Sequence, residues 1–382
     1  MNVLHVAAIT RDEPTGPGTS VPLQMQAELH AGHRVAFLQT HPGAPATVPA
    51  GVLRLAWHAG PARGLPRAFP AAAVFDAAGL WPDLVHFHSV YLSQHAAIAA
   101  AVRRLGVPTV NSPRGGLMPT ALATHRLRKR VGDALFFDRF CRRLALHRAL
   151  TEAERAACLA RYPAVPVAVA GNPVDVDAVP AAPARVRRRG SLVFGYVGRL
   201  EVWYKGLDLL LRGFARAVQR GLPADITLRI AGPDARGGDA VLRRLVADLD
   251  LRRRVTLFGA VEGAEKARFL SGIDVFVHPS RTEALPMAVL ESMAAARPVL
   301  VTPATNLGDV VTRCRAGWVV DGNPDAIAAR VAALASDADD IPARGLAARE
   351  AVRHEFSLPA IGAALTRAYV TVLERRAARG AA

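Results

Sequence analysis

The chain has 382 residues, which suits two domains, and its 48 Lys and Arg against 32 Asp and Glu give a formal net charge of +16. Its three cysteines form no CxxC pair, which argues against a zinc site or a disulfide framework and suits a reducing compartment. An apolar stretch of about eighteen residues or more and a signal peptide are both missing, so we expect a cytosolic protein that does not span a membrane.

The N-terminal residues follow the pattern of a strand, a helix and a second strand. Residues 1–9 are predicted to form a buried strand, 10–20 a loop rich in Gly and Pro, and 21–39 a helix followed by a strand. Gly16 lies in this loop, where the lack of a side chain would let phosphates approach the backbone. A turn glycine without a ligand is the alternative.

Residues 81–123 are predicted to form a strand, a helix, a second strand and a loop. Alternation along the first strand puts His86 and His88 on one face. A metal would need further ligands at suitable spacing and none is evident, so we expect packing or cleft histidines and no metal site. Arg114, in the loop SPRGGL, is suited to bind an anionic acceptor or a donor phosphate, or to pair with a surface carboxylate.

The densest basic run of the chain follows this loop. Apolar residues at helical spacing separate the charges, so an amphipathic basic face could lie on anionic lipid. A solvated, Arg-rich helix is the alternative. Nucleic-acid binding is not favoured, because no recognised DNA or RNA module accompanies the charge. The basic residues are Arg126, Arg128, Lys129, Arg130, Arg139, Arg142, Arg143 and Arg148, and the apolar ones are Leu127, Val131, Leu135, Phe136 and Phe140.

A domain boundary is expected near residues 172–191. This segment is rich in Pro, Ala and Arg, has no sustained period, and separates the apolar strand VPVAVA from the strand SLVFGYV. We therefore predict a first domain over 1–175, a linker over 176–190 and a second domain over 191–355.

Two cations follow the end of a predicted strand in the second domain. The strand ends at Gly198, and Arg199 and Lys205 come before the next helix. The carboxyl ends of parallel strands form the ligand crevice, so these cations would meet an anion there. Lysine otherwise occurs only at Lys129 and Lys266, so a lysine retained in this loop hints at a need for a compact charge.

The segment SRTEALPMAVLESMAAARPVLVT combines two carboxylates with the start of a helix. Pro286 is expected at the first helical position, so the amides of Met287 and Ala288 would form an anion site. Glu291 lies one turn after Met287, where its carboxylate could accept hydrogen bonds from ribose hydroxyls, and Glu283 lies just before the turn. The alternative is a pair of solvated glutamates on an Ala-rich helix.

Four motifs, in order, resemble the retaining glycosyltransferases of the GT-B fold, specifically the large group called family 4 or glycosyltransferase group 1. They are GRLEVWYKGLDLLL, LRIAGPDARGG, VTLFGAVEGAEKARFLSGIDVFVHPS and EALPMAVLE, within about residues 191–325. The resemblance implies an α/β fold with two Rossmann-like domains facing across a cleft, and a C-terminal helix over 356–382 that crosses back to the first domain. It also implies transfer of a sugar from a nucleotide diphosphate to an acceptor hydroxyl, with retained anomeric configuration.

The same resemblance implies roles for the donor residues. Arg199 and Lys205 would hold the diphosphate, Glu291 the ribose, and Glu283 the transferred sugar, and no protein-bound metal or cofactor would be required. Catalysis would rest on Glu283, Arg199 and Lys205. The donor-binding residues would be Gly198, Arg199, Lys205, Glu283, Leu285, Pro286, Met287, Ala288, Glu291 and Gly16.

The first domain would bind the acceptor, a saccharide or a lipid-linked saccharide of bacterial surface polysaccharide or glycolipid synthesis. The acceptor-side candidates are His88, Arg114 and Gly115. Arg114 replaces a histidine common in the family, and Ala284 replaces a common glycine. With its basic residues, the domain could also hold the protein at the inner face of the cytoplasmic membrane.

Three other functions share features with this pattern. A glycoside hydrolase is disfavoured, because eight residues along one helix rise about 12 Å, and its two carboxylates flank one bond at about 5 to 9.5 Å. A dinucleotide-dependent oxidoreductase would need a complete GxGxxG motif before the first helix, which the sequence lacks. A non-catalytic nucleotide-sugar-binding or scaffold protein that kept the fold is the remaining alternative.

Overall fold

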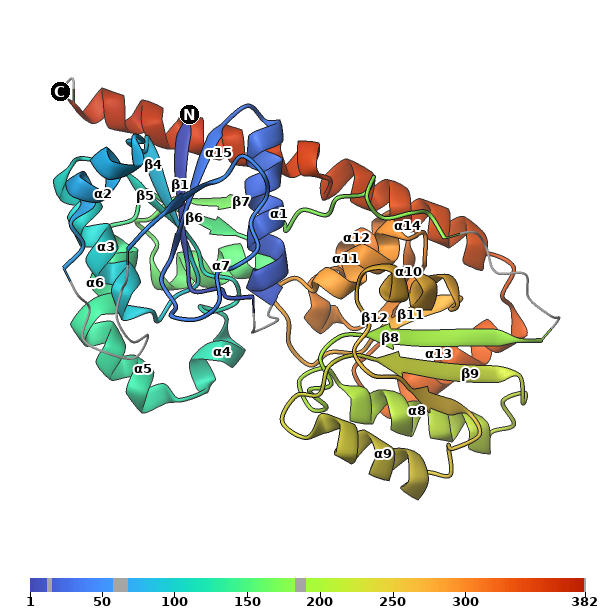
Figure 1. Ribbon diagram of the computed structural model, residues 1–382. Coiled ribbons are helices and arrows are strands. Elements are labelled where there is room, and N and C mark those ends of the chain that lie inside the picture. The colour runs from blue at the N-terminus through green and yellow to red at the C-terminus, as the bar shows by residue number, and fades with distance from the viewer. Residues whose placement is uncertain (12–15, 58–67, 183–189, 381–382) are drawn as a thin grey trace. The chain divides into compact units, whose positions relative to one another are not determined.

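The structure, a computed structural model, contains two compact units, each with its own hydrophobic core (Figure 1). Unit 1 comprises Met1–Pro173 together with Ser357–Ala382, and unit 2 comprises Val174–Phe356. The structure describes residues 1–11, 16–57, 68–182 and 190–380.

The segment 176–190, expected to be a linker, packs on unit 2 where it is described. Val176 and Ala182 are buried. The guanidinium of Arg349 donates to the carbonyl oxygen of Val176 at 3.0 Å. Small apolar side chains and a satisfied carbonyl group therefore hold this Pro- and Ala-rich segment against the unit. Residues 183–189 lie outside the described residues.

Unit 1 is built on a seven-stranded sheet in the order β3-β2-β1-β4-β5-β6-β7, and all its pairings are parallel. The central strands are almost wholly buried, as strands covered on both faces must be. The strands are β1 (Asn2–Ala7), β2 (Arg34–Gln39), β3 (Leu53–Leu55), β4 (Leu84–His88), β5 (Thr109–Ser112), β6 (Leu146–Ala149) and β7 (Val167–Val169).

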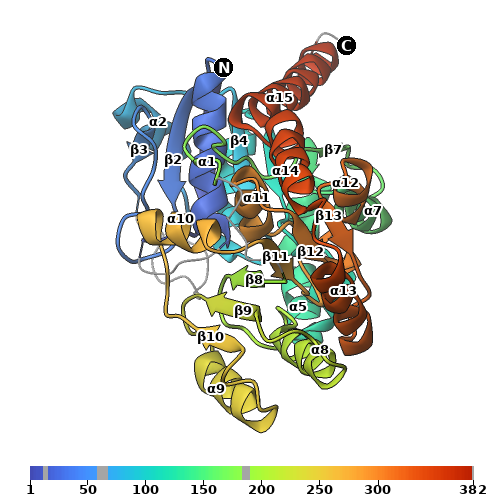
Figure 2. The same cartoon turned by 90° about the vertical axis from the view of Figure 1, so that its right-hand side faces the viewer.

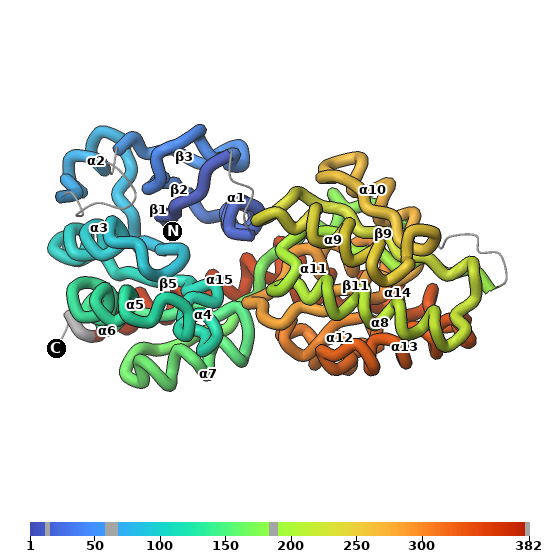
Figure 3. The backbone as a smooth tube through the Cα atoms, turned by 90° about the horizontal axis from the view of Figure 1, so that it is seen from below, coloured from blue at the N-terminus to red at the C-terminus, as the bar shows by residue number. Residues whose placement is uncertain are grey.

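Helices cover both faces of this sheet. The helices α2, α3 and α6 contribute to the core on one face, and α1 and α15 cover the other, where they pack on each other. The C-terminal helix thus belongs to the first unit, as the resemblance implied. Figure 3 shows the chain passing from α4 through α5 to α6. The helices are α1 (Gly16–His30), α2 (Ala71–Ala78), α3 (Ser93–Arg104), α4 (Pro119–Ala123), α5 (Arg126–Gly132), the π-helical turn η1 (Asp133–Phe137), α6 (Asp138–Arg142), α7 (Glu152–Arg161) and α15 (Leu358–Gly380).

Two segments expected to be loops are partly helical. The helix α1 begins at Gly16 rather than at residue 21, because Pro17 lies in the first turn, where a missing N–H removes no intrahelical bond. The loop expected to run to residue 123 ends in α4, which has Pro119 at its first position.

Unit 2 has a six-stranded parallel sheet in the order β10-β9-β8-β11-β12-β13. The order reverses between β8 and β11, which makes their carboxyl ends the topological switch point where ligands bind in open α/β sheets. The strands are β8 (Leu192–Val197), β9 (Ile226–Ala231), β10 (Val255–Leu257), β11 (Val275–His278), β12 (Val299–Val301) and β13 (Gly317–Val319).

The helices of unit 2 also lie in two layers. The helices α8 and α13 lie side by side and share the large core with α9, whereas α11 and α14 pack on each other (Figures 1 and 2). In the described parts of both units, we find no helix that is long and apolar enough to cross a membrane. The helices are α8 (Leu207–Gln219), α9 (Gly238–Asp248), α10 (Gly263–Ser271), α11 (Met287–Ala294), the 3-10 turn η2 (Pro303–Thr305), α12 (Gly308–Arg313), α13 (Pro324–Ser336) and α14 (Ile341–Glu355).

Candidate active site

The carboxyl ends of β8 and β11 bring Lys205 and Glu283 together. The Lys205 Nζ lies 2.5 Å from Oε1 of Glu283, and only 15% and 13% of the two side chains are exposed. The hydroxyl of Ser280 and Nε2 of His278 each lie 3.0 Å from the same oxygen. Among the described residues we find no hydrogen bond to the second oxygen, Oε2. The carboxylate is therefore held through three contacts to one of its oxygens.

These contacts fix the protonation of the pair formed by Glu283 and His278. Burial acts to raise the pKa of Glu283, but the hydrogen bond from His278 and the charge of Lys205 outweigh burial and lower the pKa to about 2. Burial lowers the pKa of His278, although Glu283 partly opposes it. At neutral pH the carboxylate is ionised and the imidazole neutral, so Glu283 can accept a hydroxyl proton in a hydrogen bond but has no proton to donate.

The loop after β8 is tied to the loop after β11. Arg281 forms a two-pronged ion pair with Asp208, with N–O distances of 2.7 and 2.8 Å, and its guanidinium lies over the ring of Trp203. Its backbone amide also donates to the carbonyl oxygen of Tyr204 at 2.9 Å. Since Tyr204 precedes Lys205 directly, these contacts fix where the lysine enters the site.

Two backbone features complete this connection. Gly206 has φ 64°, and a Cβ there would lie 2.0 Å from the carbonyl oxygen of Pro279, so only glycine allows the two loops to approach. The side-chain amide of Asn306 donates to the carbonyl oxygens of Glu283 and Ala284, at 2.7 and 3.1 Å. The loop that carries the catalytic carboxylate candidate is thus anchored on both sides.

The helix α11 begins one residue later than expected. Pro286 is the N-cap, with φ −75° and ψ 116°, and not the first helical residue. Its extended ψ turns the carbonyl into the helix, where it accepts from the amides of Val289 and Leu290. The amides of Met287 and Ala288 therefore stand at the helix start, where backbone N–H groups have no intrahelical acceptor. The amides that were expected to bind an anion thus stand at the helix start, with Met287 as the first helical residue.

Glu291 has a partner that the sequence did not reveal. Its carboxylate forms an ion pair with the ammonium of Lys266 from α10, and 18% and 27% of the two side chains are exposed. Each lysine of unit 2 thus pairs with one glutamate of the EALPMAVLE motif. The rarity of lysine was the one signal in the sequence that singled out Lys266, but the pairing depends on how α10 packs.

Arg199 lies apart from the ion pair of Lys205 and Glu283. Its side chain is 46% exposed, and its Nη2 lies 3.8 Å from Oε2 of Glu201. Among the described residues we find no hydrogen bond from Arg199 to Lys205 or ion pair with Glu283. Gly198, which precedes it, follows β8, which ends at Val197, one residue earlier than expected. A Cβ at Gly198 would lie 2.7 Å from the hydroxyl of Tyr196. The Leu285 side chain is buried. Arg199 is therefore a half-exposed cation in a long ion pair with Glu201, whereas the Leu285 side chain is buried in the core.

Arg114 occupies a similar position in unit 1, after β5. Its Nη1 donates to Oγ of Ser20 at 2.7 Å and to Oδ1 of Asn172 at 3.2 Å, and its Nε to Nδ1 of His88 at 3.3 Å. Burial and the charge of Arg148 lower the pKa of Arg114 to about 9, so it remains charged. We find no ion pair with a carboxylate in the described structure, which disfavours the pairing considered from the sequence.

The other candidates of unit 1 differ in access. His88 is 1% exposed, and its Nε2 lies 2.8 Å from Nδ1 of His5, so it positions Arg114 and does not face a ligand directly. The Gly115 amide donates to the carboxylate of Glu154. Gly16 is exposed at the start of α1, and a Cβ there would meet nothing within 4 Å.

The histidines of unit 1 belong to a buried polar network. His5, Glu28 and His86 have possible ligand atoms within 4.8 Å of one another, a set that suits a divalent metal and that sequence spacing did not reveal. Nε2 of His5 lies 2.6 Å from Oε2 of Glu28, and His86 contacts the hydroxyls of Tyr369 and Ser112 at 2.6 and 2.8 Å. Hydrogen bonds thus already satisfy these atoms, and β1, α1, β4 and α15 supply them from distant parts of the chain.

Comparison with known proteins identifies the fold and the second unit. Residues 191–337 match the family model described as Glycosyl transferases group 1. Over 255 residues the chain is 29% identical to a D-inositol 3-phosphate glycosyltransferase of Pseudarthrobacter chlorophenolicus, covering 63% of this chain and 59% of that protein. Over 161 residues it is 30% identical to the putative colanic acid biosynthesis glycosyltransferase WcaL of Escherichia coli, covering 40% and 39%. The chain thus matches less than two thirds of the length of these relatives.

A solved structure extends the similarity to the whole chain. The Anabaena protein HepE, in complex with UDP and glucose, superposes with a TM-score of 0.73 at 18% identity, covering 97% of this chain and 100% of that one. At this identity the likeness shows the fold, two Rossmann-like units of the GT-B type. Residues 191–337 therefore carry a group 1 glycosyltransferase domain, within a chain that has the GT-B fold.

Proposed function

We propose that this chain is a retaining glycosyltransferase that moves a sugar from a nucleotide-diphosphate-sugar to a hydroxyl of a saccharide or lipid-linked saccharide. The observation that carries the proposal is the set of three donors on one oxygen of Glu283, at the switch point of unit 2. A carboxylate held in this way, with its second oxygen free, suits the binding of a sugar hydroxyl. The named functions of the relatives, inositol phosphate glycosylation and colanic acid synthesis, agree with this substrate class.

In the proposed mechanism, unit 2 binds the donor. Glu291 accepts hydrogen bonds from the ribose, and Arg199 and Lys205 bind the diphosphate beside the start of α11. The ammonium group has three N–H donors, so Lys205 can keep Glu283 as a partner and still donate to phosphate. These charges stabilise the leaving diphosphate more strongly as the glycosidic bond breaks, because negative charge then builds on it. With cations already in place, the proposal requires no protein-bound metal.

The acceptor would be bound by unit 1 through Arg114, which suits an anionic group on the acceptor. Retention follows if the acceptor attacks the anomeric carbon from the face that the diphosphate leaves. The structure offers no second carboxylate beside Glu283 among the described residues with which a covalent glycosyl intermediate could be argued.

Exposed apolar residues support a peripheral contact of unit 1 with the cytoplasmic membrane. Leu127, Val131 and Leu135, on α5 and η1, are 77%, 52% and 63% exposed among the arginines of the basic run. Phe140 is 2% exposed and belongs to the core instead of this face. An apolar row flanked by cations is the pattern of helices that lie on anionic lipid. Such a contact would bring the enzyme to a lipid-linked acceptor in polysaccharide or glycolipid synthesis.

The proposal is tested first by thermal unfolding with UDP, GDP, ADP, CMP and dTDP, each alone and with a sugar attached. A ligand at a hundred times its Kd stabilises the fold by roughly 2.7 kcal/mol, which is easily measured. We expect a selective shift with one diphosphate, lost in Lys205→Ala and Glu291→Ala. The matching nucleotide sugar is then incubated with saccharide acceptors, and the configuration of the new bond is read by NMR.

A nucleotide-sugar-binding protein without transfer is the second candidate, because Arg114 occupies the place of a histidine common in the family. A selective thermal shift without release of nucleotide diphosphate, over a panel of neutral and phosphorylated acceptors, would favour it. No shift with any nucleotide would contradict both candidates.

A further inference from the structure

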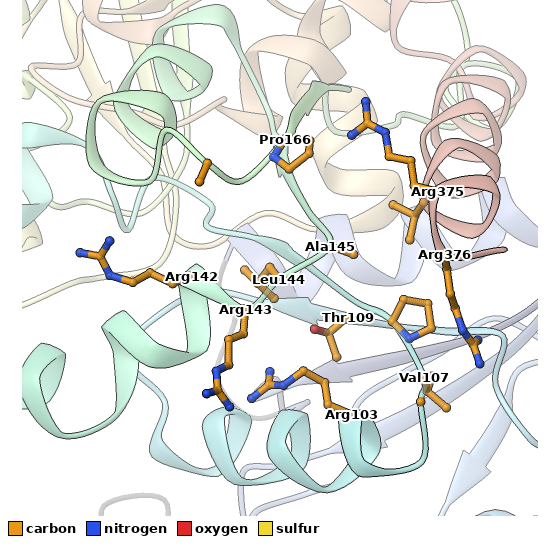
Figure 4. A pocket seen from close by; sticks show the side chains of 14 residues that line it. Arg103, Val107, Thr109, Arg142, Arg143, Leu144, Ala145, Pro166, Arg375 and Arg376 are labelled. Carbon is orange, nitrogen blue, oxygen red and sulfur yellow. The ribbon is translucent and has the colours of Figure 1, made fainter. Parts of the chain in front are cut away.

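Five arginines line a pocket of about 460 Å³ on unit 1 (Figure 4). Arg103 comes from the end of α3, Arg142 ends α6 and Arg143 follows it, and Arg375 and Arg376 come from α15. These three helices are far apart in sequence, so only the fold brings the charges together. The side chains of Arg103 and Arg143 point toward one another in Figure 4.

The pocket lies at the amino ends of the strands, whereas the candidate acceptor residues lie at the carboxyl ends. Thr109 begins β5, and Pro166 precedes β7, so both mark the amino ends of the strands. Arg114 follows the carboxyl end of β5. The Thr109 hydroxyl is buried, and within the described residues it has no hydrogen-bond partner. The pocket thus combines cations with an unsatisfied hydroxyl, away from the proposed transfer site.

The charges of this pocket are not balanced by its lining, which contains no Asp or Glu among the described residues. One terminal nitrogen of Arg103 is buried without a hydrogen-bond partner in the described structure. Burial and the charges of Arg143 and Arg139 lower the pKa of Arg103 to about 10, and it still carries its charge at neutral pH. Like charges that converge on a buried, unsatisfied donor are stabilised by an anion.

A second, partly apolar groove adjoins this pocket and indicates which anion the pocket binds. The groove, of about 730 Å³, shares Arg103 and Arg143 with the pocket and is also lined by Arg104 and Arg139. Its apolar wall consists of three alanines of α3, Leu135, Phe136 and Phe140. Leu135 is 63% exposed. A soluble phosphate would use the arginines alone, whereas an amphiphile with an anionic head would use both the cations and the apolar wall.

We infer that the arginine pocket binds the phosphate headgroup of an anionic lipid, with the lipid's apolar part along the groove beside Leu135 and Phe136. Arginine is suited to this role, because its planar fork donates two parallel hydrogen bonds to phosphate oxygens. The inference goes beyond the proposed transfer reaction, since it assigns a headgroup site that needs neither donor nor acceptor.

The test measures partition of the full chain onto vesicles made of equal parts of phosphatidylcholine and phosphatidylglycerol, with pure phosphatidylcholine as the neutral reference. Arg103→Gln/Arg143→Gln should bind at least about tenfold more weakly, because each basic residue near such a surface contributes about a fivefold factor. Arg375→Gln/Arg376→Gln changes exposed positions of α15 and should weaken binding similarly. It keeps the test valid if the first variant loses its fold in a thermal-unfolding check.

Two controls separate the headgroup pocket from bulk charge and from free phosphate. Arg252→Gln/Arg253→Gln removes the same charge from exposed positions of unit 2 and should leave partition unchanged. Leu135→Gln should weaken vesicle binding but leave binding of soluble glycerol 1-phosphate, measured by calorimetry, unchanged.

Three results would overturn the inference. One is vesicle binding of both arginine variants at the level of the unchanged chain. Another is an equal loss in Arg252→Gln/Arg253→Gln, which would mean that net charge alone drives binding. The third is glycerol 1-phosphate binding as tight as vesicle binding with no effect of Leu135→Gln, which would mean a site for free phosphate.

Discussion

At the scale of single residues, the site depends on how one carboxylate is shared. Lys205, His278 and Ser280 all contact Oε1 of Glu283, so removal of one partner changes the charge balance without emptying the site. Lys205→Ala should lower kcat/KM by about a hundredfold or more, since it removes the proposed leaving-group contact. Thermal unfolding should change far less, and Lys129→Ala, a lysine of unit 1, is the matched control. Parallel losses of stability and activity in Lys205→Ala would show a structural role instead.

The depressed pKa of Glu283 predicts a pH dependence of stability. Relative to its ordinary value of 4.5, a folded pKa of about 2 means that Glu283 stabilises the fold above pH 4.5 and loses this contribution as the pH falls toward 2. The variant Glu283→Gln lacks this pH-dependent contribution to stability. The difference in unfolding free energy between wild type and Glu283→Gln should therefore shrink by about 2 kcal/mol from about pH 6 to about pH 3. Urea titrations at both pH values measure it, and parallel curves would contradict the assignment.

The two glutamates of the EALPMAVLE motif should affect different steps of the reaction, Glu291 the binding of the nucleotide and Glu283 the transfer. Glu291→Ala should weaken nucleotide binding about tenfold or more, because it removes the proposed charge-assisted hydrogen bonds to the ribose. Calorimetry measures the Kd. Glu283→Ala should mainly lower kcat, because the proposed partner of Glu283 is the transferred sugar. Lys266→Ala tests whether the ion pair positions Glu291, and it should weaken nucleotide binding in the same direction. The opposite division between Kd and kcat would reverse the two roles.

At the scale of elements, the close approach of two loops sets the site. Gly206→Ala places a Cβ 2.0 Å from the carbonyl oxygen of Pro279 and must also keep φ 64°, so the loops have to separate. We expect a loss of more than about 2 kcal/mol in unfolding free energy, together with loss of nucleotide binding. Gly221→Ala is the matched control, since its φ is also positive but a Cβ there meets nothing within 4 Å. It should cost about 1 kcal/mol and keep nucleotide binding, and equal effects of both changes would contradict the loop argument.

At the scale of the whole molecule, unit 1 is discontinuous and unit 2 is not. Tyr369 of α15 is fully buried and donates to Glu28 at 2.8 Å, so a chain that ends at Phe356 would expose an apolar face and break the histidine network. We expect this chain to lose the unfolding transition of unit 1 but to keep the nucleotide-dependent stabilisation of unit 2, in calorimetric scans. A chain that ends at Arg376 removes only the end of α15 and should keep both transitions. Two intact transitions in the shorter chain would show that unit 1 does not need α15.

The sequence by itself determined the alternation of strands and helices, the two-unit organisation of the fold, and the group 1 motifs around Glu283 and Glu291. These features are local, because apolar periodicity and motif spacing record which residues face a core. It misplaced the start of α1 and the cap of α11, because a proline at a helix start fits both a loop and the first turn.

Only the tertiary structure decided which side chains meet. Lys266 with Glu291, His5 with Glu28, and the arginine pocket all join residues that strand order and helix packing bring together from distant positions. Such contacts leave no periodic signal, since each depends on how parallel strands and crossing helices place residues far apart along the chain. The chemistry of the residues was visible in the sequence, and their partners were a property of the fold.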